Sequence, residues 1–268
     1  MARVRLRGAT LDVWDEGNGR PVLLLHGFPT TQRLWRAVVP KLVSAGCRVV
    51  APDLAGYGQS DADADADVGM AQQARWMNEL IEVLALERPL LVAHDVGTAA
   101  AQILAAQFPD RISGLVLIDG VYEENWAMEA IASIQSWKAA DAHRLFPLLL
   151  RRLRSSAASG GSISDQIARE VLAPYEGATG GLRLIRAARA LNPRETRGIA
   201  ERLRPHGIPT LVLWGEEDRY FPVEEVARPL ANALGAKLEL ARGGHFLPLD
   251  APDAVSGEIV AFLNHLDR

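Results

Sequence analysis

Short apolar runs alternate with longer amphipathic segments along the first 120 residues. Continuous apolar runs, typical of strands buried on both faces, occupy residues 21–25, 48–51, 90–93 and 115–118. Segments with apolar residues at helical spacing occupy residues 31–43, 71–86 and 96–108. Strands that alternate with helices in this way predict an α/β fold with a mostly parallel sheet.

The pattern changes after residue 120. Residues 121–206 show helical spacing and no clear strand, and strand character returns at residues 210–214 and 237–240. An all-helical insertion between two sheet strands is typical of a lid. We therefore predict a core domain of residues 1–120 and 207–268 and a helical cap domain of residues 121–206.

The apolar run at residues 90–93 leads into a tight turn. Ala93 and Gly97 are small and flank Asp95 at a distance of two residues, and an alanine-rich segment with good helix propensity follows. A strand-turn-helix of this kind lifts its apex residue out of the sheet, as in a nucleophile elbow. The apex here is Asp95, where many such turns carry serine.

The composition favours a protein that acts on small molecules. The 268 residues are 49% hydrophobic and carry a formal net charge of −4, which provides no basic field for nucleic acid. The longest apolar runs are far below the ~18 residues of a membrane span, no signal peptide is visible, and the single cysteine, Cys47, is expected to be buried. We expect a cytoplasmic location by default and no membrane partner. A homodimer is compatible with the sequence.

A glycine-rich stretch at residues 56–58 and an acidic stretch at residues 61–67 are the places where a cofactor or metal site would be sought, and neither predicts one. Residues 56–58 lack the spacing of a dinucleotide-binding loop, and no His, Cys and carboxylate cluster has zinc-like spacing. The Asp-Ala repeat at residues 61–67 has no apolar face and predicts an exposed loop or a frayed helix entry. We therefore expect no cofactor and no metal.

Three residues with catalytic chemistry follow predicted strands. Asp95, Asp218 and His245 each lie at the carboxyl end of a strand, where open α/β sheets build their sites. Their order along the chain is nucleophile, acid, histidine, which is the order of α/β-hydrolases.

Over essentially its full length the chain resembles an α/β-hydrolase. The matching motifs are His-Gly-Phe-Pro at 26–29, Asp-x-x-Gly-x-Gly-x-Ser at 53–60, the turn at 93–97, Leu-Trp-Gly-Glu-Glu-Asp at 213–218 and Gly-Gly-His at 243–245. The resemblance implies an α/β-hydrolase fold with an eight-stranded, mostly parallel sheet, flanking helices and a helical cap. His-Asp-x-Gly resembles the aspartate-nucleophile branch, which holds epoxide hydrolases, haloalkane dehalogenases and fluoroacetate dehalogenases.

An aspartate apex narrows the reaction type. A carboxylate attacks a carbonyl poorly but can displace a leaving group from saturated carbon, which leaves an alkyl ester on the enzyme. We expect His245, held by Asp218, to activate water against that ester, and the backbone amides of Phe28 and Val96 to hold the oxyanion.

The groups that assist the leaving group in each subfamily are absent or displaced. Epoxide hydrolases use tyrosines of the cap to protonate the epoxide oxygen, but Ile185 occupies one such position here. The residue after the nucleophile is Trp in haloalkane dehalogenases and Arg in fluoroacetate dehalogenases. This chain has Val96 at that position. An apolar pocket around Val96 and Ile185 predicts an uncharged, fairly hydrophobic substrate. The expected substrate contacts are His26, Tyr122, Trp126, Trp137, His143, Tyr175, Ile185 and Phe246.

These observations favour a cofactor-free hydrolase of the epoxide hydrolase type. A haloalkane or haloacid dehalogenase is the first alternative. The others are a lyase or a ring-opening or ring-closing enzyme that uses Asp95 as a base, and a non-catalytic ligand-binding protein with the same fold.

Overall fold

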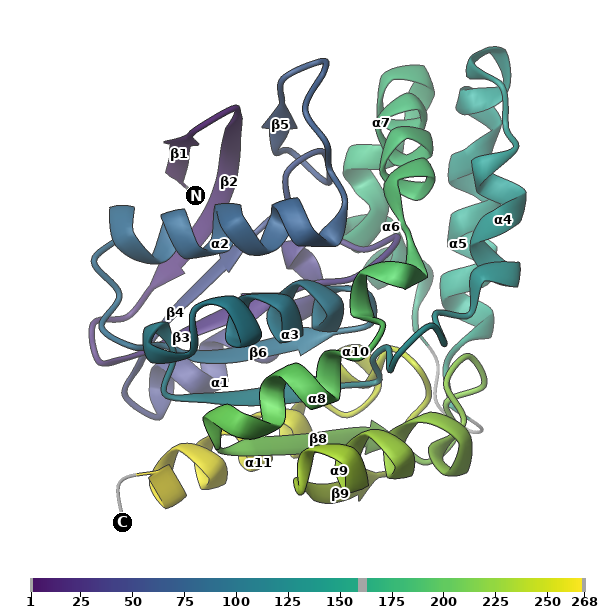
Figure 1. The fold of residues 1–268 in the computed structure, drawn as a ribbon. Helices are drawn as coiled ribbons and strands as arrows, with labels where there is room; N and C mark the ends of the chain where they lie inside the picture. The colour runs from purple at the N-terminus through teal and green to yellow at the C-terminus, as the bar shows by residue number, and fades with distance from the viewer. Residues whose placement is uncertain (1, 159–162, 267–268) are drawn as a thin grey trace.

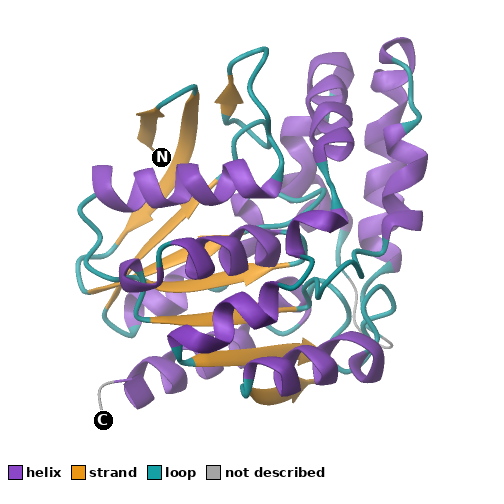
Figure 2. Ribbon diagram, in the orientation of Figure 1, coloured by secondary structure: helices purple, strands orange, loops and turns teal. Residues whose placement is uncertain are grey.

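A computed structural model describes residues 2–158 and 163–266 of the chain. Its centre is a nine-stranded sheet in the order β1-β2-β4-β3-β6-β7-β8-β9, with the short β5 paired to β2 (Figures 1 and 2). All pairs from β4 to β9 in this order are parallel, and those made by β1, β5 and the β2–β4 edge are antiparallel. The strands are β1 (Ala2–Leu6), β2 (Ala9–Glu16), β3 (Arg20–Leu25), β4 (Cys47–Pro52), β5 (Asp61–Ala62), β6 (Leu90–His94), β7 (Gly114–Ile118), β8 (Thr210–Gly215) and β9 (Lys237–Ala241).

The mostly parallel sheet is confirmed, with one addition. The loop prediction for residues 61–67 is wrong at its first two positions, because Asp61 and Ala62 form β5 and pair with Thr10 and Ala9 of β2. The pairing adds a ninth, two-residue strand to the eight that were expected.

Helices cover both faces of the sheet. Helices α2, α3, α8 and α9 lie on one face, and α1 and α11 lie behind it (Figure 1). None of the helices in the described ranges is long and apolar enough to cross a bilayer. The helices are α1 (Val39–Ser44), α2 (Met70–Val83), α3 (Gly97–Gln107), α4 (Met128–Gln135), α5 (Leu145–Ser155), α6 (Asp165–Leu172), α7 (Gly177–Ala190), α8 (Ile199–Leu203), α9 (Arg228–Leu234), α10 (Leu247–Asp250) and α11 (Pro252–Leu266).

The chain between β7 and β8 is helical. Helices α4, α5 and α7 stand beyond the end of the sheet to which the arrows of β6 and β8 point (Figure 1). Helix α7 packs against α4 and the 3-10 helix η3 (Ala139–Arg144), whereas α8 packs against α3 and α9 beside the sheet. The division into a core and a cap of residues 121–206 stays a prediction.

The central strands lie in the core. Every residue of β6 and β7 is buried, as the continuous apolar runs in their sequences require. Side chains within these strands are therefore closed off from substrates, and polar groups become accessible only in the turns at the strand ends.

Candidate active site

Asp95 lies at the apex of a strained turn between β6 and α3. Its φ is 53°, in the left-handed region that residues other than glycine rarely adopt. Close backbone packing holds the turn: a Cβ at Gly97 would lie 2.4 Å from the carbonyl oxygen of His26, and one at Gly27 would lie 2.4 Å from the Cβ of Asp95. Glycine at these two positions therefore lets the strand ends of β3 and β6 meet at the Asp95 carboxyl group.

The two oxygens of Asp95 have different surroundings. Oδ1 accepts a hydrogen bond of 2.6 Å from the backbone N–H of Val96, and Oδ2 lies 3.9 Å from Nε2 of His245. Burial and the charge of Asp218 raise the pKa of Asp95 to about 7, against the lowering effects of His245 and of the backbone N–H groups of Val96 and Phe28. The predicted oxyanion donors, Phe28 and Val96, thus both act on this carboxyl group.

Asp218 and His245 form the second half of the site. Nδ1 of His245 lies 3.0 Å from Oδ2 of Asp218, whose Oδ1 accepts the backbone N–H groups of Tyr220 and Phe221. Burial lowers the pKa of His245, but the charge and hydrogen bond of Asp218 outweigh burial and, with the charges of Asp95 and Asp119, raise it to about 9. With Nδ1 donating to Asp218, Nε2 is the nitrogen that faces Asp95.

Two further buried groups hold the loops of the site together. Asp119, directly after β7, accepts the backbone N–H of Gly215 at 2.7 Å and that of Leu247 at 3.4 Å, so it joins the loops of Asp218 and His245. Burial and the charge of Asp218 raise the pKa of Asp119 well above its ordinary value. His94 packs its ring against that of His245, with 5.0 Å between the ring centroids.

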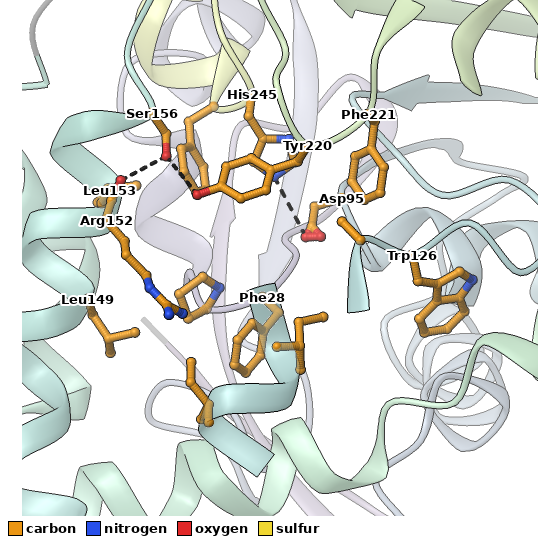
Figure 3. A pocket seen from close by; sticks show the side chains of 15 residues that line it. Phe28, Asp95, Trp126, Leu149, Arg152, Leu153, Ser156, Tyr220, Phe221 and His245 are labelled. Atoms are coloured by element: carbon orange, nitrogen blue, oxygen red, sulfur yellow. Dashed lines mark hydrogen bonds and ion pairs between the residues drawn. The ribbon is translucent and has the colours of Figure 1, made fainter. Parts of the chain in front are cut away.

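Asp95 and His245 open into a pocket beneath the insertion helices (Figure 3). The pocket encloses about 560 Å³ of empty space, part of it open to solvent. Its polar lining residues are Asp95, Arg152, Ser156, Tyr220 and His245. Its apolar lining residues are Phe28, Pro29, Trp126, Ala127, Ile131, Ile134, Leu149, Leu153, Phe221 and Phe246. Within residues 2–158 and 163–266, no group of three or more His, Cys, Asp and Glu is placed to hold a metal ion.

Two of the expected substrate contacts line this pocket, Trp126 and Phe246, and so does Phe28, which was predicted as an oxyanion donor. Trp126 does so with its ring, because its indole N–H donates to Oγ1 of Thr196 at 2.7 Å and to the carbonyl oxygen of Glu123 at 3.1 Å. Val96 contributes its backbone N–H to Asp95, while its side chain is fully buried.

Three predicted contacts are buried elsewhere in the fold. The Tyr175 hydroxyl donates to the carbonyl oxygen of Thr30 and accepts the N–H of Gly58. His26 accepts the N–H of Leu54 on Nε2, and burial lowers its pKa to about 4. Ile185 is buried on α7. None of the three is among the described residues that line the pocket.

The remaining predicted contacts lie nearer the surface. His143 is exposed and contacts the carbonyl oxygen of Ala140, Trp137 is half-buried against the core, and Tyr122 forms a short bridge with Asn125. The described pocket lining includes none of them. Packing of the insertion helices, rather than sequence position in the insertion, decides which side chains face Asp95.

Sequence reasoning missed three polar lining residues: Arg152, Ser156 and Tyr220. Tyr220 follows Asp218 by two residues at the end of a strand, so its place could have been predicted. The pocket lining is also less uniformly apolar than expected. The prediction of an uncharged substrate relied on the side chains of Val96 and Ile185, and neither is part of the described lining. Arg152, which carries a charge, is part of it.

Comparison with known proteins agrees with this fold. Residues 20–252 match a family model described as alpha/beta hydrolase fold. An epoxide hydrolase of Caballeronia sordidicola is 28% identical over 312 aligned residues, covering 98% of this chain and 93% of that protein, and haloalkane dehalogenase 2 of Mycobacterium tuberculosis is 29% identical over 263 residues, covering 92% and 88%. A solved alpha/beta hydrolase fold protein from Burkholderia ambifaria superimposes with a TM-score of 0.81 at 28% identity, covering 97% of each chain. The chain therefore belongs to the α/β-hydrolase family of enzymes.

Proposed function

We propose that the protein hydrolyses a small, largely apolar substrate at a saturated carbon through an ester on Asp95, in a reaction of the epoxide hydrolase type. The observation that carries the proposal is that the two oxygens of the Asp95 carboxyl group have different partners. Oδ1 is held by the N–H of Val96, and Oδ2 faces His245 and the pocket. One oxygen is thus bound as an oxyanion would be, and the other is placed to attack.

In the first step, Oδ2 of Asp95 attacks an epoxide carbon and the carbon–oxygen bond of the ring breaks. The electron pair moves to the ring oxygen, which then takes a proton. Tyr220 is the tyrosine among the described lining residues, and its hydroxyl lies 3.2 Å from Oγ of Ser156. Because that Ser156 hydroxyl donates to the carbonyl oxygen of Arg152, Tyr220 is the donor in the pair, and an epoxide oxygen can take the place of Ser156 as its acceptor.

In the second step, water attacks the carbonyl carbon of the ester and its proton passes to Nε2 of His245. The negative charge of the tetrahedral intermediate falls on Oδ1, where the N–H groups of Phe28 and Val96 stabilise it. Collapse breaks the bond between Cγ and Oδ2, and the departing alkoxide takes the proton from His245 and leaves as a diol. The carboxylic acid left on Asp95 gives its proton back to the Tyr220 phenolate, which restores the starting enzyme. Ester formation also removes the Asp95 charge, one of the charges that raise the pKa of His245, so the imidazole loses its proton more readily when it must act as a base.

The pocket favours an epoxide over a halide. A relative named haloalkane dehalogenase makes dehalogenation the alternative function, and a departing halide needs N–H donors around it. The indole N–H of Trp126, which lines the pocket, already donates to Thr196 and Glu123. The Tyr220 hydroxyl, by contrast, is an acid of the kind that an epoxide oxygen requires.

Single-turnover hydrolysis in oxygen-18 water tests the covalent step. With enzyme in excess over styrene oxide, we expect the label in the peptide that contains Asp95, because water attacks the ester carbonyl and not the substrate. Label found only in the diol would contradict the proposal and favour direct attack by water, with Asp95 as a base. A screen of epoxides against bromoalkanes of matched length separates the two leaving groups.

A further inference from the structure

One charged side chain of the pocket has no part in the chemistry at Asp95. Arg152 of α5 lines the same pocket as Asp95, and Figure 3 shows the two on opposite sides of it, with the Arg152 guanidinium extending between Leu149 and Phe28. Nη2 of Arg152 donates to Oγ of Ser133 on α4 at 3.0 Å. The guanidinium is therefore fixed where α4 and α5 meet, at the pocket.

The sequence of α5 directs this arginine inward. Leu149, Arg152, Leu153 and Ser156 are spaced three to four residues apart and all line the pocket. The helix carries other arginines on its outer side: Arg151 is exposed, and Arg154 is exposed and pairs with Asp165. Arg152 thus occupies a position of the apolar stripe, where its charge faces the substrate.

Apolar side chains lie between the two ends of this pocket. Phe28, Ile131, Ile134 and Leu149 line it together with Asp95 and Arg152. A substrate that satisfies both ends has a reactive saturated carbon, an apolar segment and a group that accepts hydrogen bonds from a guanidinium.

We infer that Arg152 is a specificity-determining residue that binds a carboxylate at the end of the substrate remote from Asp95. The inference rests on the proposed function and narrows its substrate class to apolar epoxides that carry a carboxylate. A guanidinium presents its N–H donors in a planar fork that matches the two oxygens of a carboxylate, and such charge-assisted pairs are about twice as strong as neutral hydrogen bonds.

Kinetics on a matched pair of substrates tests the inference. We would compare 5,6-epoxyhexanoate with 5,6-epoxyhexanamide, which differ in charge but hardly in shape. We expect kcat/KM to favour the carboxylate, and the Arg152→Gln variant to reduce the ratio of carboxylate to amide by about tenfold or more, mainly through KM. Arg152→Lys should keep part of the preference. Arg151→Gln, on the exposed side of the same helix, should leave the ratio as in the wild type.

A loss of activity that is equal for both substrates would overturn the inference, since a guanidinium that only joins α4 to α5 through Ser133 affects both alike. Wild-type protein that shows no preference for the carboxylate would also overturn it. Salt provides a readout without substitution: sodium chloride should raise the KM for the carboxylate and not that for the amide.

Binding to the Asp95→Asn variant separates this inference from the proposed function. We expect calorimetry to show hexanoate binding more tightly than hexanamide, and Arg152→Gln in the same background to remove the difference. If no ester forms on Asp95 but hexanoate is still preferred, the proposed reaction fails and the carboxylate subsite stands. If an ester forms and hexanoate has no advantage, the subsite fails and the reaction stands.

Discussion

Nε2 of His94 lies 2.7 Å from the backbone carbonyl oxygen of His245, so the residue before the proposed nucleophile holds the backbone of the proposed base. His94 is fully buried, and burial together with the neighbouring His245 lowers its pKa well below the ordinary value, which keeps it neutral. A neutral ring that donates from Nε2 has an unprotonated Nδ1, and that atom has no hydrogen-bond partner in the described structure. The ring therefore holds the backbone of His245 through one hydrogen bond, which its Nε2–H donates.

This hydrogen bond predicts a positioning role for His94. In His94→Leu the loop of His245 loses its fixed point, and a displacement of about 1 Å can slow a reaction by roughly a hundredfold. We expect the hydrolytic step to slow more than ester formation, so that labelled ester accumulates in rapid-quench experiments. His94→Gln, which keeps a donor at similar reach, should restore most of the rate. Equal loss in the two variants would show that only the size of the ring matters.

Asp95→Asn should abolish turnover and stabilise the protein. Burial raises the pKa of Asp95 from an ordinary value near 3.8 to about 7, so the folded protein binds this proton more tightly than the unfolded chain. Its contribution to stability therefore falls as the pH rises from about 4 to about 7, and the charged form destabilises the fold above that range. At pH 8 we expect the variant to gain at least about 1 kcal/mol, or roughly 2–4 °C in Tm. Calorimetry at pH 8 and at pH 4, where the gain should vanish, checks the sign.

The two steps of the reaction should respond differently to pH. Ester formation needs the Asp95 carboxylate, whose pKa is about 7, so its single-turnover rate should fall as the pH drops below that value. Ester hydrolysis needs neutral His245, and the ester removes one of the charges that raise its pKa to about 9 in the free enzyme. We expect hydrolysis to titrate below pH 9. An ester that hydrolyses with a pKa at or above 9 would contradict this account of the base.

The sequence predicts which polar residues meet at the edge of the sheet better than it predicts which side chains line the pocket, for a physical reason. Asp95, Asp218 and His245 each follow a buried strand, and the parallel sheet brings the carboxyl ends of such strands to one edge. Local pattern is therefore enough to bring these three together. The triad roles themselves stay a prediction until the variants are measured.

The insertion follows no such rule. Tyr175 and Arg152 both belong to helical segments of the insertion, yet the Tyr175 hydroxyl bonds to Thr30 and Gly58 while Arg152 lines the pocket. The difference comes from how the helices of the insertion pack on one another and on the core, which involves contacts more than a hundred residues apart. Helical spacing identifies the stripe that contains Arg152, but does not show that this stripe faces Asp95.

Asp119 predicts a change in both stability and the pKa of His245. Its carboxylate accepts the N–H groups of Gly215 and Leu247, so Asp119→Ala leaves two buried donors without this partner and should cost about 1–3 kcal/mol for each unsatisfied group. Asp119→Asn removes the charge with little change in volume. Because that charge helps to raise the pKa of His245, we expect the pKa to fall in this variant, as an NMR titration of the imidazole would show. An unchanged titration would limit Asp119 to holding the loops.

Tyr220→Phe separates the epoxide reaction from dehalogenation. The ring of Tyr220 packs edge-on against His245 with 4.9 Å between centroids, and phenylalanine keeps that contact while it removes the hydroxyl. An epoxide oxygen departs as an alkoxide and needs a proton, whereas bromide leaves as a stable anion. General-acid assistance contributes typically about 10²–10⁴-fold, so epoxide opening should fall by at least about a hundredfold and far more than the displacement of bromide from an alkyl bromide of the same chain length. Burst measurements of ester formation on Asp95 compare the two directly, because they exclude the later hydrolysis. If the rate of ester formation falls equally for both substrates, the role of Tyr220 is to hold His245 in place. Another group of the pocket would then have to protonate the epoxide oxygen.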